Sequence, residues 1–504
     1  MRTKIVLTIC LLAVLGGCAV NPVTGQRELT LVSDQQAIAI GTQQYGPGQQ
    51  MHGGPYRTDP ALTEYVNRVG QKLGVASGVS LPYEFVVLNN STPNAWALPG
   101  GKIAINRGLL QLLRNEAELA AVLGHEIAHA AARHGAKRIE RGLLTQGVVL
   151  GAAIAASGSE YGNYAVGAVA QAGALLGLKY SRDAEREADF YGTEFMAKAG
   201  YDPNAAVTLQ EKFLQLSDSS QQITWLASHP TSQERVNNNR QHVRQLRQQG
   251  YEGGTLAGLA YQAATETLRR HAEAYDQYDE AVARLGDNEL EAALVQVNAA
   301  LNAYPAEALF HGLRGAIRLQ QQRFDDALTN FDRAIDRDSG YFAHYLHRGI
   351  THAQVGTTSL AKTDLDRSVR LLPTSLAYHH LGEIAESSGD VDMAKKYYEQ
   401  ASQAGGEAGM AAKRRLVRLE IGDQPAKYVR AQVVVRDGVN LLVVENLAGI
   451  ELADVNLRVD YATAAGRDGT TIRLATLNEG VQVEFARGLT LVSAEAYAVS
   501  ASLN

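Results

Sequence analysis

The stretch AAVLGHEIAHAAARHG, residues 120–135, combines side chains that bind metals with the apolar pattern of a buried helix. His125 and His129 are four residues apart, so on a helix they lie one turn apart on one face, about 5–6 Å between Cβ atoms. Glu126 follows the first histidine, where it can reach a water beside a metal ion without binding the ion itself. This HExxH spacing predicts a zinc hydrolase site, and the alternative is a pair of histidines satisfied within the core.

A catalytic zinc needs a third protein ligand and one open coordination position. His134 is a candidate by residue type, but it lies five residues after His129 and is therefore rotated off the predicted metal face. The extended pattern HExxHxxGxxH is excluded, because the chain has Ala132 and Gly135 where that pattern needs glycine and histidine. We therefore expect the third ligand to come from another part of the chain.

Two carboxylates in YSRDAEREADFYG, residues 180–192, have the spacing needed for such a role. Glu185 and Asp189 are four residues apart on a predicted helix. One carboxylate could bind zinc while the other accepts a hydrogen bond from a ligand histidine and orients it. Acidic pairs at this spacing are also common on solvated helix surfaces, so the pattern alone leaves both interpretations open.

HEIAH followed by SRDAEREAD resembles the HtpX and CAAX-prenyl-protease superfamily of gluzincin zinc metallopeptidases. The resemblance extends to three further motifs and covers about residues 21–245. It implies that Glu185 is the third ligand of one zinc ion per chain. The further motifs are NPVTGQRELTLVS (21–33), NAWALPGGKIAINRGLL (94–110) and SHPTSQERV (228–236).

The resemblance also places His229, which precedes Pro230 in a predicted turn, close to the metal. Two roles are open for this histidine: donation to the developing oxyanion, or occupation of the fourth zinc position in a resting state. Arg235 or Arg240 could hold the same loop or an oxyanion. An ordinary surface histidine before proline is the plain alternative.

A strand, a tight turn and a second strand are predicted for AWALPGGKIAINRG, just before the histidine helix. The resemblance to gluzincins implies that a strand edge beside the metal binds extended substrate backbone, and the alternative is a hairpin of the core. Asn94 and Trp96 either line the cleft or brace it. Two apolar stretches, residues 143–157 and 164–178, are too short to span a bilayer comfortably. We expect close-packed helices under or over the cleft, and the alternative is a membrane-dipping or lid role.

The N-terminus has the pattern of an export signal. Arg2 and Lys4 precede an apolar run, and LGGC, residues 15–18, resembles the lipobox of bacterial lipoproteins of the LoiP type. We expect residues 1–17 to be a signal peptide and Cys18 to be lipidated, with sorting to the periplasmic side of the outer membrane. An ordinary signal peptide with an incidental cysteine is the alternative.

The chain is too long for one core and predicts several domains. Its 504 residues carry a formal charge of −6 with a pI of about 6.1, which gives no sign of a nucleic-acid partner. We expect a mainly α, multidomain protein with an α-rich zincin-type domain and a small β-sheet. The predicted divisions are a signal peptide (1–17), an anchor and lead-in (18–55) with a short helix over Ser33 to Tyr45, a zinc metallopeptidase domain (56–250), tetratricopeptide repeats (260–420) and a small β-sandwich (427–504).

An internal repeat supports the fourth division. Ala281, Gly315, Gly349 and Gly382 follow one another at steps of 34, 34 and 33 residues, and apolar or small residues recur 12, 16 and 19 positions after each. This period is typical of a tetratricopeptide repeat, and generic helical hairpins would not keep the register. The following histidines are expected at its groove or surface rather than in a second metal site: His344, His347, His352, His379 and His380. After about residue 427 the period changes to alternation, as in VNLRVDY and VQVEF, which predicts strands.

Together these patterns predict a zinc endopeptidase of the periplasm that is anchored to the outer membrane. The family resemblance alone implies that it degrades or processes misfolded or misassembled envelope proteins. Glu126 would serve as general base and proton carrier at the scissile bond. The layout is similar to that of BepA-type proteases, which implies binding of outer-membrane proteins or their assembly machinery by the repeats. The alternative is a periplasmic chaperone or scaffold whose metal site is structural or capped.

Overall fold

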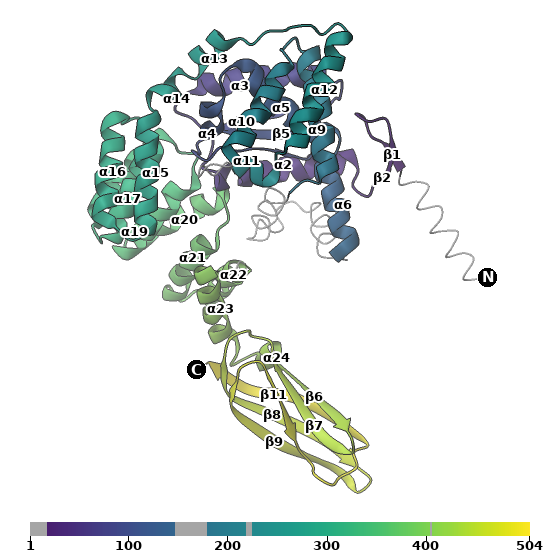
Figure 1. Cartoon of the computed structure of the whole chain (residues 1–504). Helices are drawn as coiled ribbons and strands as arrows, with labels where there is room; N and C mark the ends of the chain where they lie inside the picture. The colour runs from purple at the N-terminus through teal and green to yellow at the C-terminus, as the bar shows by residue number, and fades with distance from the viewer. Residues whose placement is uncertain (1–17, 147–178, 218–223, 404–405, 504) are drawn as a thin grey trace, which may run out of the picture. The chain divides into compact units, whose positions relative to one another are not determined.

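The computed structural model describes residues 18–146, 179–217, 224–403 and 406–503 (Figure 1). Its first elements form the lead-in: β1 (Cys18–Val20) pairs antiparallel with β2 (Arg27–Leu29), and α2 (Asp34–Met51) follows. Ser33 caps α2 through a reciprocal capping box with Gln36. The predicted lead-in helix thus forms, and it runs beyond Tyr45 to Met51.

The first compact unit, residues 1–373, contains a small three-stranded sheet. Its strands are β3 (Glu84–Leu88), β4 (Ala95–Leu98) and β5 (Lys102–Asn106), in the order β3-β5-β4. β3 runs parallel to β5, and β4 pairs antiparallel with β5 around Gly100 and Gly101, which have φ of +79° and +85°. These backbone angles favour glycine. The predicted hairpin is confirmed, and β4 is an edge strand of this sheet.

Helices surround the small sheet (Figure 1). Nearly every residue of the histidine helix α5 (Glu116–Ala131) is buried, as its apolar frame predicts, and Asn115 caps its first turn. The other helices of this part are α3 (Pro60–Ala76), α4 (Arg107–Leu112), α6 (His134–Gln146), α9 (Arg182–Lys198), α10 (Asn204–Ser217), α11 (Thr224–Ser228) and α12 (Gln233–Gln248).

The two apolar stretches predicted near the cleft lie almost wholly outside the described residues. Only 143–146, at the end of α6, fall within them. In the part of the chain that the structure describes, no helix is both long enough and apolar enough to cross a membrane.

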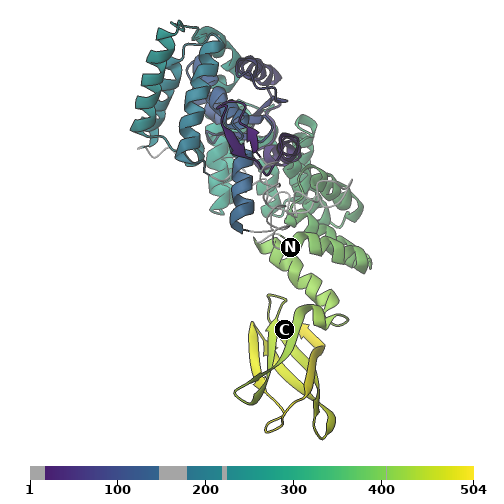
Figure 2. The ribbon, with the colours of Figure 1, turned by 90° about the vertical axis from the view of Figure 1, so that its right-hand side faces the viewer.

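Helical pairs continue the chain after α13 (Gly258–Ala264) and α14 (Glu266–Arg270) (Figure 2). The repeat positions predicted from the sequence are fully buried where helices of a pair meet, for example Ala293, Phe331 and Leu365. The paired helices of the first unit are α15 (Ala272–Gly286), α16 (Leu290–Ala303), α17 (Ala308–Gln320), α18 (Phe324–Arg337), α19 (Phe342–Gln354) and α20 (Thr358–Leu371).

One repeat histidine departs from the expectation of a groove or surface position. His344 is 2% exposed, and its ring lies against Gly312, where a Cβ would come within 2.8 Å of the ring. The glycine leaves the room that the imidazole fills, so His344 is a core residue of the repeats.

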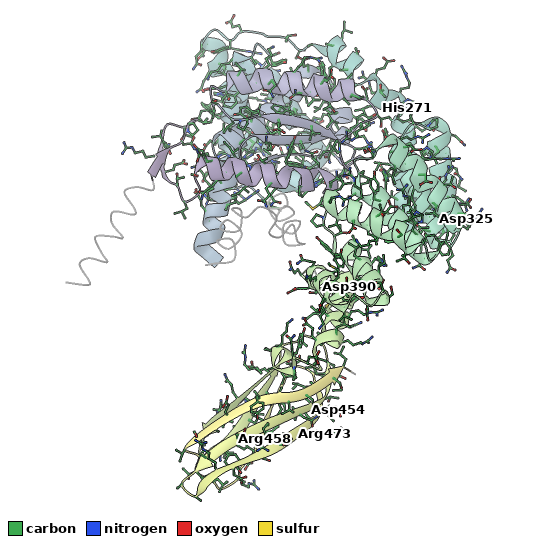
Figure 3. All side chains as sticks on the ribbon, turned by 180° about the vertical axis from the view of Figure 1, so that it is seen from behind. His271, Asp325, Asp390, Asp454, Arg458 and Arg473 are labelled. Atoms are coloured by element: carbon green, nitrogen blue, oxygen red, sulfur yellow. The ribbon has the colours of Figure 1, made fainter. Side chains whose placement is uncertain are left out.

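The second compact unit, residues 374–504, contains four helices and six described strands. Its strands form two three-stranded antiparallel sheets, β10-β7-β6 and β11-β8-β9, around a shared apolar core. Asp454 of β8 and Arg473 of β9 pair on the outside, and both are labelled in Figure 3. The mainly α fold class with terminal antiparallel strands is confirmed. The elements are α21 (Ser375–Ser387), α22 (Val391–Ser402), α23 (Gly406–Glu420), α24 (Pro425–Tyr428), β6 (Val429–Arg436), β7 (Val439–Asn446), β8 (Leu452–Thr463), β9 (Gly466–Leu477), β10 (Gly480–Glu484) and β11 (Ser493–Leu503).

Candidate metal centre

Four buried side chains converge on one point: His125, His129, Glu185 and His229. One ligand atom from each lies within 4.8 Å of the others. His129 Nε2 is 3.0 Å from His125 Nε2, and a carboxylate oxygen of Glu185 lies 3.3 Å from His129 Nε2. Two imidazoles and a carboxylate at such separations are a donor set typical of zinc, so the residues fit this metal.

Two helices bring these donors together. The i, i+4 spacing on α5 places both histidine rings on one face, and Ser181 caps α9 so that Glu185 falls in its first turn. The helices approach closely because glycines meet at their crossing: a Cβ on Gly192 of α9 would lie 2.9 Å from the backbone of Gly124 of α5. The distant carboxylate thereby reaches the histidine pair.

Asp189 lies behind the histidine pair rather than among the ligand atoms. Its Oδ1 is 3.1 Å from His125 Nδ1, the ring nitrogen that faces away from His129. Arg235, which is 5% exposed, binds both oxygens of Asp189 at 2.7 Å and lies 2.8 Å from Glu185 Oε2. Asp189 thus contacts His125, and Arg235 contacts both carboxylates.

The pKa values at the site follow from burial and these contacts. Burial lowers the pKa of His125, but hydrogen bonds with Asp189 and Glu185 outweigh it and raise the pKa to about 9. Burial holds the pKa of His129 well below its ordinary value. Burial raises the pKa of Glu185, but the charge of His229 and hydrogen bonds from the histidines outweigh it and hold the pKa well below the usual range. The metal-free site therefore contains an ionised carboxylate and one neutral imidazole.

The general-base candidate Glu126 is fully buried beside this cluster. Trp225 of α11 donates from its indole N–H to Glu126 Oε1 at 3.0 Å. The other oxygen, Oε2, has no hydrogen-bond partner among the described residues. One oxygen is thus fixed and the other is available to a water.

His229 lies inside the cluster, at the end of the short helix that carries Trp225. Its Nδ1 is 2.9 Å from Glu185 Oε1 and 3.2 Å from His125 Nε2, and its backbone N–H donates to the Trp225 carbonyl. Arg235 also donates to the carbonyl of Pro230 at 2.7 Å, which fixes the turn. Arg240, the alternative to Arg235, instead pairs with Glu211 at the surface.

The edge strand β4 packs against the histidine helix, and a pocket opens between them beside His129. Its walls include Ala37 of α2, Leu98 and Pro99 of the hairpin, and Tyr180, whose ring stacks on His129 at 3.8 Å. Trp96 is buried against Tyr45 with ring centroids 6.0 Å apart, so it braces the sheet.

Sequence reasoning missed Trp225 and Tyr180. Neither residue belongs to a spacing pattern that indicates a metal site. Trp225 on α11 and Tyr180 just before α9 come close to the metal ligands only when the chain folds. The aromatic residue four positions before His229 is the one local signal that could have suggested Trp225.

Comparison with known proteins shows which families parts of this chain resemble. Residues 60–243 match the family model "Peptidase family M48", and residues 376–404 match "Tetratricopeptide repeat". The described site residues of the first compact unit all fall inside the first match.

Curated relatives also match this chain. The putative beta-barrel assembly-enhancing protease of Vibrio cholerae is 32% identical over 229 residues, which cover 43% of this chain and 46% of that protein. The beta-barrel assembly-enhancing protease of Escherichia coli K12 is 29% identical over 316 residues, covering 57% and 64%. The mitochondrial metalloendopeptidase OMA1 of Schizosaccharomyces pombe is 37% identical over 176 residues, covering 34% and 51%. The chain thus spans about half to under two thirds of the length of these relatives.

Proposed function

The chain carries a peptidase family M48 domain at residues 60–243 together with a tetratricopeptide repeat, and from this premise we propose that it is a zinc-dependent endopeptidase. The family resemblance predicted from HEIAH and SRDAEREAD is thereby confirmed. The proposal rests on one observation: two imidazoles and a distant carboxylate converge beside the buried Glu126, which has one carboxylate oxygen without a hydrogen-bond partner in the described part of the chain.

His125, His129 and Glu185 would hold the zinc. His125 Nε2 and His129 Nε2 face each other at 3.0 Å, while Nδ1 of His125 lies 3.1 Å from Asp189 Oδ1 and Nδ1 of His129 lies 2.8 Å from His134 Nδ1. The low pKa values of Glu185 and His129 keep both groups in the forms that bind a cation. Asp189 would fix the ring of His125 from behind, as neighbours of metal ligands commonly do.

When bound, zinc supplies a Lewis acid that polarises the scissile carbonyl and favours ionisation of the attacking water. Glu126 accepts the proton of that water on its free oxygen while Trp225 holds the other oxygen, and it then delivers the proton to the leaving amine. The buried surroundings of Glu126 strengthen these interactions because the local dielectric is low.

His229 would occupy the fourth position around the metal in a resting state. The support is its Nδ1 atom, which lies among the ligand atoms rather than at a distance suited to a separate oxyanion. The two roles predict opposite results for His229→Ala. If His229 occupies the metal in a resting state, the variant should cleave substrate faster. If His229 donates to the oxyanion, the rate of cleavage should fall by about 100-fold or more.

We further infer that the substrates are misassembled envelope proteins and that the repeats bind them or their assembly machinery. Support comes from the relatives named beta-barrel assembly-enhancing protease and from the repeat that follows the peptidase domain. The LGGC sequence supports lipidation of Cys18 and attachment to the periplasmic face of the outer membrane. A chaperone or scaffold with a capped metal site is the second candidate, favoured by the position of His229.

Replacement of Glu126 by glutamine tests the enzyme proposal. The purified protein and its Glu126→Gln variant are compared for zinc content and for degradation of casein, with and without a chelator. We expect equal zinc content and a loss of at least about 100-fold in rate. If the variant binds zinc and degrades casein as fast as the parent protein, the mechanism is wrong. If both are inert while deletion of the repeats abolishes function in the cell, the scaffold candidate is favoured.

A further inference from the structure

His134 is a third histidine of the HEIAHAAARH stretch, and the proposed chemistry leaves it without a role. It is 5% exposed at the start of α6 and lies outside the group of ligand atoms. Its Nδ1 is 2.8 Å from Nδ1 of His129, and its Nε2 is 3.5 Å from Oε1 of Glu187 on α9. His129 thus directs Nε2 toward the metal position and Nδ1 toward His134.

The turn between α5 and α6 creates this contact. Had the helix continued, residue 134 would point about 140° away from His129. Instead α5 ends at Ala131, and Arg133 adopts a positive φ of 62°, which L-residues rarely do. Arg133 donates to Thr30 at 3.1 Å and pairs with Asp34 at 2.8 Å, so contacts with the lead-in segment hold the turn. The chain therefore turns after Ala131 and places His134 beside His129 Nδ1.

The chemistry of the two rings gives the contact a direction. An imidazole that binds a metal through Nε2 is neutral and carries its proton on Nδ1, so that nitrogen must donate. His134 can accept on Nδ1 only if its own proton is on Nε2. That N–H would then lie 3.5 Å from Glu187 Oε1, beyond a hydrogen bond but close enough for the carboxylate's charge to favour a proton on Nε2.

We propose that His134 is the positioning residue of His129, held in the accepting tautomer by Glu187. It would act on His129 as Asp189 acts on His125, so each ligand histidine is oriented from behind by a residue that does not itself reach the metal. This inference rests on the proposed function, because it takes His129 to be a zinc ligand.

Replacements of His134 separate orientation from simple packing. In His134→Asn the amide oxygen can take the place of Nδ1, so the acceptor is kept. In His134→Gln the amide lies near the former Nε2, and in His134→Phe the ring is kept without an acceptor. Glu187→Gln removes the carboxylate that selects the tautomer. His352→Phe, in the repeats, is the matched control, because His352 also uses Nδ1 in a hydrogen bond, at 2.8 Å to Thr357.

The measurements are zinc affinity by chelator competition and the visible spectrum of the cobalt-substituted protein, on the full mature chain. We expect a 10- to 100-fold loss of zinc affinity and a changed cobalt spectrum in His134→Phe and His134→Gln, in the range for partners of metal ligands. His134→Asn should restore both, Glu187→Gln should show a smaller loss, and the control should match the parent.

Parent-like affinity and spectrum in His134→Phe and His134→Gln would overturn the inference while leaving the zinc site intact. Equal losses in His134→Asn, His134→Gln and His134→Phe would also overturn it, since packing alone would then explain them. Should His134→Phe fail to fold, the comparison of His134→Asn with His134→Gln decides. Failure of the parent protein to bind zinc would instead overturn the proposed function.

Discussion

At the scale of single residues, the site depends on which ionisable groups are protonated before a metal arrives. The pKa of His125, raised to about 9, means that this ring is charged at neutral pH in the metal-free protein. A charged ring contributes folding stability that is fully present below its unfolded pKa near 6.5 and is lost as pH rises through 9. Zinc requires the neutral ring, so protons and zinc compete for His125.

The first prediction concerns the pH dependence of zinc binding. Because His125 must lose its proton, zinc affinity of the metal-free protein should rise by up to about tenfold per pH unit between pH 7 and 9 and then level off. Calorimetry in buffers of different ionisation enthalpy should detect release of about one proton per zinc at pH 7.5. Asp189→Asn, which removes a hydrogen bond that raises this pKa, should flatten the dependence. A flat profile in the parent protein would contradict the assignment.

Single residues differ in how far the sequence predicts them. His125, Glu126 and His129 lie on one helix, so their spacing alone indicates the chemistry. Glu185 is 56 residues from His129, so no local spacing connects it to the histidines. Glu185 and Asp189 belong to the same acidic pattern, and only the family resemblance indicates which of the two is the metal ligand. Trp225 and Tyr180 carry no such pattern, because their contacts with Glu126 and His129 exist only in the folded chain.

At the scale of elements, the site requires helices α5 and α9 to pack closely where Gly124 and Gly192 meet. A side chain on Gly192 would meet the backbone of Gly124 and His125 at 2.9 Å. Backbone cannot move aside as a flexible side chain can, so any larger residue must separate the two helices. The distance between Glu185 and the histidine pair depends on that separation.

The second prediction tests this crossing with Gly192→Ala. We expect a loss of about 1–3 kcal/mol in stability and weaker zinc binding, even though alanine favours helices over glycine. Gly286→Ala on α15 is the control, because its Cβ would meet nothing within 4 Å. That variant should be unchanged or more stable by up to about 1 kcal/mol. Equal melting temperatures and zinc affinities in the two variants would show that the crossing tolerates a methyl group.

Element prediction succeeded where a local pattern exists. The Gly100-Gly101 turn and its flanking strands follow from glycine and alternation, and the repeat helices follow from their period. The turn at Arg133 could not be predicted, because its positive φ is stabilised by Thr30 and Asp34, about 100 residues earlier in the chain. That turn decides where His134 lies.

At the scale of the whole molecule, a buried polar network joins the peptidase part of the first compact unit to its repeats. Glu307, at the start of α17, is 1% exposed and accepts hydrogen bonds from Thr58 and Asn89 at 3.0 Å and from Tyr275 at 2.5 Å. Arg107 is fully buried, bonds to Asn89 at 2.9 Å and lies over the Tyr275 ring at 3.4 Å. The repeats thus complete the packing of the peptidase domain.

The third prediction is that Glu307→Gln weakens this junction. Both oxygens of the Glu307 carboxylate accept hydrogen bonds from buried donors. The glutamine N–H₂ group cannot accept, so at least one donor is left without an acceptor, which should lower the stability by about 1–3 kcal/mol. A lower melting temperature and faster proteolysis near Gly250–Gly254 should follow. Glu289→Gln, at the exposed N-cap of α16, is the matched control and should change stability by less than about 0.5 kcal/mol. Equal behaviour of the two variants would contradict a structural role for the network.

The sequence predicted the repeats but not this junction. The 34-residue period reports contacts between neighbouring repeat helices. Glu307 is not part of that pattern, because the equivalent positions in the next two repeats are Tyr341 and Thr374. Its partners Thr58 and Asn89 lie more than 200 residues away. The predicted domain boundaries stay predictions, as do the signal peptide and the lipid anchor.

The most direct measurement is a crystal structure of the protein grown with zinc, with an anomalous difference map at the zinc absorption edge. The account predicts one strong peak about 2.0–2.2 Å from His125 Nε2, His129 Nε2 and a Glu185 oxygen. His229 Nδ1 would complete the coordination in the resting state. A peak elsewhere, or no peak at these residues in a zinc-saturated crystal, would contradict the claim that this cluster is the metal centre of a peptidase.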